Sequence, residues 1–116
     1  MFKIEIVKKE ISLEELKKIA EKNYGDMVKA VVDIKQGIIA VGGEWHVDAE
    51  QVLLENGSRQ TDLWGINLYP NGSLEKMIEY NSLINIRPRE GNRRADIDLP
   101  EIREKISKII FELIKQ

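Results

Sequence analysis

The sequence predicts one α+β domain over residues 1–116, in which a mixed or antiparallel sheet is packed by helices. Three observations favour this class. Several short stretches are rich in Val and Ile and alternate apolar with polar residues, as strands do. Two helix-start signals and one long amphipathic stretch predict three helices. Turn residues separate neighbouring strands as in hairpins, so the expected order of elements is βαββαββα.

The first strand and the first helix have clear local signals. Residues 2–9 alternate apolar and charged side chains, which is the pattern of a strand with one buried face. Ser12 is expected to cap the following helix, and Glu15 stands at the third helical position, where its side chain can return a hydrogen bond to the cap. Gly25 lies where the chain must leave that helix.

The next part of the chain predicts two strands and a short helix. Residues 27–34 and 37–41 are rich in Val and Ile and are separated by a tight connection. Asp48 is expected to cap the second helix, with Gln51 at its third helical position. This short helix should run to about Glu55, where the pair Asn56-Gly57 would end it.

A hairpin is expected to follow, with residues 63–69 and 76–86 as its strands. Asn71-Gly72 is the pair that favours a two-residue type I′ turn. A continuous ladder through that turn would set Asn67 opposite Lys76 and Asn85 opposite Ser58. The apolar phase of the returning strand changes, so we expect an irregularity near residues 80–82.

The last helix is expected to begin near Pro100, because proline is favoured in the first turn of a helix. Its apolar stripe consists of Ile102, Ile106, Ile109, Ile110, Leu113 and Ile114. Phe111 lies on the opposite side of this helix, where it would either cover a second layer or meet another subunit.

Composition narrows the classes of function. The chain has no cysteine, which excludes thiolate catalysis and sulfur-based zinc sites. A net charge of −2 gives no global field for nucleic acid, so such a partner is disfavoured. No run reaches the length of a membrane helix, and the N-terminal residues lack the apolar core of a signal peptide, so a cytoplasmic location is expected. The richness in Glu, Lys and Ile is typical of proteins from hot environments.

The best candidate site is the basic stretch at residues 87–94, which holds four guanidinium groups within a slightly acidic chain. These groups could converge on a small anion, with neighbouring amides orienting it. The candidate ligand-binding residues are Arg87, Arg89, Arg93, Arg94, Asn85 and Asn92. Two structural interpretations stay open: the arginines could form ion pairs with nearby carboxylates, and buried amides such as Asn85 could pin the hairpin to loops.

Glu44 and His46 form a second candidate, because two residues apart in an extended segment they would share one side. Such a pair could move a proton or bind a metal, or lie at the rim of the anion site. Two ligands without a third do not make a metal site, so neither a metal nor a cofactor is expected. A structural histidine is the alternative interpretation.

Several segments together resemble a known family. They are Gly42-Gly43-Glu44, Leu53-Leu54-Glu55-Asn56-Gly57-Ser58, Asp62-Leu63-Trp64-Gly65-Ile66-Asn67, Tyr69-Pro70, Ile84-Asn85-Ile86-Arg87-Pro88 and Gly91-Asn92-Arg93. The chain is similar in them to a family of small uncharacterised prokaryotic proteins, catalogued as a domain of unknown function. The resemblance covers nearly the whole chain and implies one intact domain, but no activity, cofactor or catalytic residue.

Three hypotheses about function follow from the residues. The first is a cytoplasmic binding protein that takes a small anionic ligand, such as a nucleotide, a phosphorylated metabolite or a carboxylate, through the Arg-rich loop. The second is an enzyme that uses Glu44 and His46 as an acid/base or metal pair. The third is a homo-oligomeric structural or assembly module in which Phe111 lies at the interface.

Overall fold

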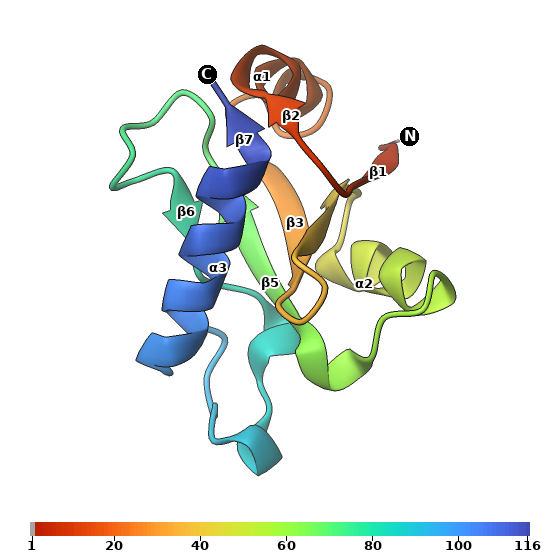
Figure 1. Ribbon diagram of the computed structural model, residues 1–116, viewed down its shortest axis with the longest axis vertical. Helices are drawn as coiled ribbons and strands as arrows, with labels where there is room; N and C mark the ends of the chain where they lie inside the picture. The colour runs from red at the N-terminus through yellow and green to blue at the C-terminus, as the bar shows by residue number, and fades with distance from the viewer. Residues whose placement is uncertain (1) are drawn as a thin grey trace.

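The structure, a computed structural model, describes residues 2–116 and consists of an antiparallel five-stranded sheet with helices on both faces (Figure 1). The strands run in the order β1-β4-β3-β5-β6. Their bounds are β1 Ile4–Val7, β4 Ile38–Gly42, β3 Val28–Asp33, β5 Leu63–Leu68 and β6 Ile78–Glu79. The predicted α+β class and the antiparallel sheet are confirmed.

Three helices cover the sheet from two sides. Helices α1 (Leu13–Glu21) and α3 (Pro100–Leu113) pack against one face, around a core that includes Leu16, Ile106 and Ile110. Helix α2 (His46–Glu55) packs against the other face through a smaller apolar cluster. The middle strands β3, β4 and β5 are therefore covered on both faces, which explains their nearly continuous apolar sequences. No helix in residues 2–116 has the length and apolar character needed to span a membrane.

Two predicted helix starts are confirmed. Ser12 Oγ accepts a hydrogen bond of 3.0 Å from the Glu15 amide at the start of α1. Pro100 is the first residue of α3, and Phe111 lies on the exposed side of that helix, with 40% of its surface accessible. The sequence did not predict the short parallel pair of β2 (Ile11–Ser12) and β7 (Ile114–Lys115), in which the last residue of the predicted apolar stripe lies.

The predicted cap of the second helix is wrong. Helix α2 begins at His46, after the cap residue Trp45, and Asp48 lies within its first turn. The Asp48 amide donates to the Trp45 carbonyl over 3.0 Å, so Asp48 is already helical. The chain turns early because Gly42 and Gly43 adopt φ angles of 108° and 98°, which bring it directly from β4 into the helix.

The predicted type I′ hairpin is also wrong. Pro70 fixes its own φ near −65° and so directs the turn to Tyr69–Gly72, where the Gly72 amide donates to the Tyr69 carbonyl over 2.9 Å. Neither Asn71 nor Gly72 has the positive φ that type I′ requires. Asn67 consequently pairs with Glu79, not with Lys76.

The returning strand is much shorter than expected. Strand β6 ends at Glu79, and the predicted irregularity near residues 80–82 is where the regular ladder stops. Beyond it the chain forms a 3-10 turn at Leu83–Asn85 and a second one at Pro88–Glu90. Asn85 therefore does not pair with Ser58 as a ladder residue would, which leaves the outer edge of β5 without a neighbouring strand over most of its length.

We expect Gly65→Ala to destabilise the protein, because a Cβ at position 65 would lie 2.5 Å from the Ser82 Cβ. Overpacking of this kind costs about 2–3 kcal/mol. Urea unfolding of Gly65→Ala should show this loss, and the same change in a Ser82→Gly background should cost clearly less. An equal cost in both backgrounds would contradict the proposed contact.

Candidate functional site

The side-chain amide of Asn85 replaces the missing strand beside β5. Its Oδ1 accepts from the Gly65 amide over 2.8 Å, and its Nδ2 donates to the Gly65 carbonyl over 2.9 Å. The same Nδ2 donates to the Ala95 carbonyl over 3.1 Å. Asn85 is fully buried, so these bonds satisfy backbone groups that water does not reach. The absence of a Cβ at Gly65 leaves room for Ser82 and Ile84 against the strand.

A second buried amide, that of Asn92, holds the loop that follows. Its Nδ2 lies within 2.8 to 3.0 Å of three backbone carbonyls, those of Asn85, Arg94 and Asp96. Its Oδ1 accepts from the Asp98 amide over 2.7 Å. Both asparagines are thus engaged with the backbone, as in the interpretation that buried amides pin the hairpin to loops. Their ligand-orienting role stays a prediction.

Arg87 leaves this loop and lies against the sheet. Only 10% of its side chain is exposed, and its guanidinium carbon lies 4.8 Å from the ring centroid of Trp64. Its Nε donates to the Ile84 carbonyl over 3.1 Å. Carboxylates of Glu50 and Glu90 lie 3.6 Å and 3.9 Å from guanidinium nitrogens, which is beyond hydrogen-bonding distance.

The two terminal nitrogens of Arg87 are buried and have no hydrogen-bond partner among the residues that the structure describes. Burial lowers the pKa of this guanidinium, against the opposing effects of Glu90 and Glu50. Burial likewise raises the pKa of the Glu50 carboxyl, while Arg87 and a hydrogen bond from Gln60 act to lower it. The pair is therefore only partly satisfied by its own neighbours.

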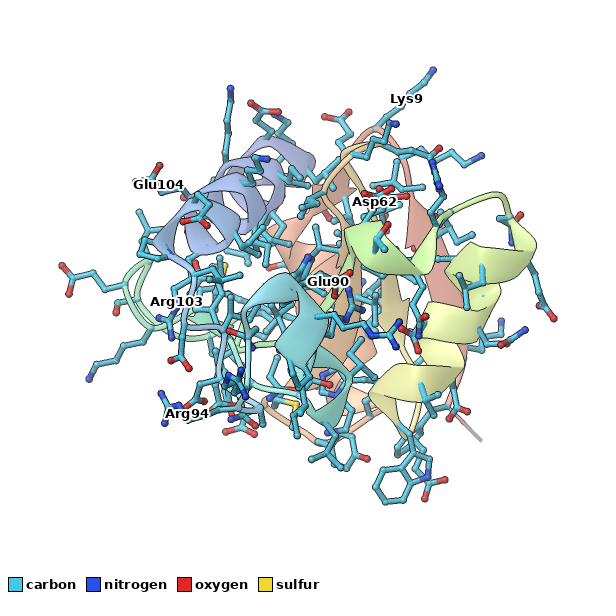
Figure 2. The ribbon with its side chains drawn as sticks, turned by 90° about the horizontal axis from the view of Figure 1, so that it is seen from below. Lys9, Asp62, Glu90, Arg94, Arg103 and Glu104 are labelled. Carbon is cyan, nitrogen blue, oxygen red and sulfur yellow. The ribbon has the colours of Figure 1, made fainter. Side chains whose placement is uncertain are left out.

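Arg87 and Glu50 line a cleft of about 620 Å³ between α2, the 3-10 turn at Gln60–Asp62 and the loop around residues 83–90. Arg89 and Glu90 also line it. Figure 2 looks onto this end of the molecule and shows Glu90 near the middle, between the cyan loop and the yellow helix α2. The cleft thus combines both signs of charge with an apolar wall that includes Leu83 and Ile86.

The four arginines do not converge on one point. Arg94 lies toward the edge of Figure 2, away from Glu90, and forms a two-point ion pair with Asp98 at 2.7 and 2.9 Å. Hydrogen bonding in this pair raises the pKa of Arg94 and lowers that of Asp98. Arg93 is exposed and does not line the cleft. Of the predicted cationic set, Arg87 and Arg89 are the two that share the cleft.

Glu44 and His46 are placed apart from this cleft and in different environments. Glu44 is exposed, whereas His46 is buried and its Nε2 lies 2.8 Å from the Ile66 carbonyl. Because a carbonyl only accepts, Nε2 carries the hydrogen. Burial lowers the pKa of this imidazole. No group of three potential metal ligands occurs within residues 2–116, and the acid/base pair stays a prediction.

Two residues that matter here were not among the sequence candidates. Glu50 lies in the middle of α2, and Trp64 lies on β5. A glutamate on an amphipathic helix normally faces water, so its burial beside Arg87 depends on the approach of a distant loop. One signal was available: Glu50 stands at a helix position between Ala49 and Leu53, both of which are buried.

We expect Asn85→Leu to lower the free energy of unfolding by about 3 kcal/mol, because it leaves the Gly65 amide and carbonyl buried and unpaired. Amide hydrogen exchange at Gly65 should become faster, by a factor that corresponds to the same loss of free energy. Asn71→Ala, at an exposed turn position, is the control and should stay within about 0.5 kcal/mol of the parent. A similar loss in both variants would contradict the structural role of Asn85.

His46 should make stability depend on pH. The unfolded chain takes up a proton near the ordinary pKa of 6.5, whereas the native imidazole resists it. The unfolded state therefore binds more protons, so stability is full above about pH 7 and falls as the pH decreases, by at most about 1.4 kcal/mol per unit. Denaturant unfolding at several pH values gives the free energy of unfolding as a function of pH. This free energy should change less steeply with pH in His46→Gln than in the parent protein. An unchanged slope would contradict the assignment.

Comparison with known proteins gives a family and no activity. Neither the curated proteins nor the solved structures include a match to this chain. One family model matches residues 5–113, and it is described as a protein of unknown function. The match spans every helix of the structure and every strand except β7 and the first residue of β1, in agreement with the resemblance noted from the sequence. The chain therefore belongs to the DUF5674 family of proteins of unknown function.

Proposed function

We propose that this protein binds a small ligand with an anionic group in the cleft beside α2. The observation that carries the proposal is Arg87, whose side chain is nine-tenths buried and whose two terminal nitrogens have no hydrogen-bond partner in the described part of the chain. A buried charged donor without an acceptor is costly. A carboxylate or phosphate would supply two acceptors in the geometry of the guanidinium fork.

The surroundings of Arg87 support binding of an anion at this place. The indole of Trp64 backs the guanidinium, and the Nε bond to Ile84 fixes the inner end of the group. Because the terminal nitrogens are shielded from solvent, we expect the outer part of the side chain to turn toward the cleft on binding. Arg89, which is exposed at the cleft and has no ion pair within residues 2–116, would add a second positive charge.

The cleft favours a small and only weakly charged ligand. Glu50 and Glu90 line it together with the two arginines, so its formal charges balance. A polyanion such as nucleic acid would meet two carboxylates, whereas a ligand with one anionic group and several hydroxyl or amide donors could satisfy both signs. A cavity of about 620 Å³ lies within the usual range for small-molecule sites.

Titration with inorganic phosphate and with acetate, followed by amide NMR shifts, tests this proposal. We expect saturable millimolar binding centred on residues 87–90, and its loss in Arg87→Gln. Glu50→Gln should bind about five to ten times more tightly, because it removes the carboxylate that competes for the guanidinium. The opposite effects of these two substitutions cannot arise from unfolding.

Arg94→Gln is the matched control, because Arg94 is exposed and paired with Asp98 away from the cleft. Arg94→Gln should leave the affinities for the two probe anions unchanged. The proposal is wrong if neither probe gives a saturable shift with the parent protein, or if Arg94→Gln weakens binding as much as Arg87→Gln does.

A further inference from the structure

A second cleft lies beside the first and shares Leu83 and Ile84 with it as a common wall. Its cavity volume is about 290 Å³, which suits a single ring with a substituent. Side chains from α2 and the Leu83–Asn85 turn form its apolar walls, and β5 contributes to its polar lining. The anion proposal uses none of the polar groups of this cleft.

Asn67 lines this cleft and holds an unsatisfied acceptor. The residue is 6% exposed, and its Nδ2 donates to Glu79 Oε1 over 2.7 Å and to the Asn81 carbonyl over 3.3 Å. These two acceptors fix the orientation of the amide, because a flipped Asn67 would place its oxygen against the Glu79 carboxylate. Its Oδ1 is buried and has no hydrogen-bond partner among residues 2–116.

His46 lines the same cleft and holds a second potential acceptor. Its Nε2 hydrogen is used by the Ile66 carbonyl at 2.8 Å, so in the neutral ring Nδ1 presents a lone pair. Burial disfavours the charged form of the imidazole and lowers the pKa of His46, against the opposing effects of Ile66 and Asn67. Asn67 and His46 therefore both offer acceptors, and a ligand that pairs with them must carry hydrogen-bond donors. Lys29 also lines the cleft, which favours a neutral donor over a cation.

The walls of this cleft are apolar and unusually exposed. Trp45, Val47 and Leu83 have 62%, 54% and 80% of their surface accessible. Large apolar side chains this exposed around one hollow are typical of binding sites. The indole of Trp45 provides a flat surface on which a planar ring can stack.

We propose that the second cleft binds a planar aromatic or heteroaromatic ligand that carries neutral N–H donors, such as a carboxamide or an exocyclic amino group. The ring contacts Trp45, Val47 and Leu83, and the N–H donors bind Asn67 Oδ1 and the His46 imidazole. This inference goes beyond the anion site and does not rest on it, since the acceptors and the stacking surface belong to the second cleft alone.

Benzamide and acetophenone test the inference, because they have the same shape and differ in an amino and a methyl group. We expect benzamide to give saturable NMR shifts of the Trp45 indole N–H and of the Val47 and Ile84 amides, with millimolar affinity. Acetophenone should bind about five times more weakly, which is the factor that one neutral hydrogen bond contributes.

Three variants make the result specific. Trp45→Ala and Leu83→Ala, at exposed positions whose change leaves the core intact, should each abolish or strongly weaken benzamide binding. Phe111→Ala, at another exposed aromatic residue, and Arg89→Ala, in the anion cleft, should leave it unchanged. The inference is overturned if benzamide does not bind, if both probes bind equally, or if Phe111→Ala weakens binding as much as Trp45→Ala does.

Discussion

The paired hydrogen bonds between the Asn85 side chain and the Gly65 backbone determine how the C-terminal half of this protein is built. Strand β6 stops after Glu79, so the chain that follows must satisfy the open edge of β5 by other means. A primary amide has the same donor and acceptor as a peptide unit, and it can therefore stand in for a strand while the backbone that carries it turns away. Asn92 repeats this principle for the next loop.

Both proposed clefts follow from this arrangement. The turn held by Asn85 places Leu83 and Ile84 between α2 and the loop, so a hollow remains on each side of them. The same turn directs Arg87 inward, over Trp64 and toward Glu50. An ion pair at 3.6 Å with unsatisfied donors contributes less to stability than a well-packed apolar group would. The unsatisfied donors of Arg87 are the basis of the proposal that this cleft binds an anionic group.

Local signals in the sequence were sufficient where the structure depends on neighbours in the chain. The start of α1 follows from Ser12 and Glu15, and the start of α3 follows from Pro100. Competing local signals gave errors: Pro70 determined the turn predicted from Asn71-Gly72, and Gly42 and Gly43, at the end of β4, brought the chain into α2 before Asp48. The short pair β2 and β7 could not be predicted, because each strand has only two residues.

The candidate site could be predicted only in part, because local sequence signals do not report contacts between distant parts of the chain. The density of arginine identified the loop that contains Arg87 and Arg89, but not which guanidinium groups turn inward. Glu50 and Trp64 join Arg87 through tertiary contacts between distant elements, which no spacing rule reports. The second cleft was missed because its evidence is an unpaired atom, Asn67 Oδ1, and pairing is a property of the folded chain alone.

The parallel pairing of Ile11 with Ile114 has a consequence for folding. These residues lie near opposite ends of the described chain, and α3 supplies Ile106 and Ile110 to the same core as Leu16 of α1. The main core is thus completed only when the last helix docks. Contacts between residues so far apart in the sequence slow folding, because the entropy of loop closure is lost before the stabilising contacts form. The chain should therefore fold as one cooperative unit after synthesis of its last helix, and not progressively from its N-terminal end.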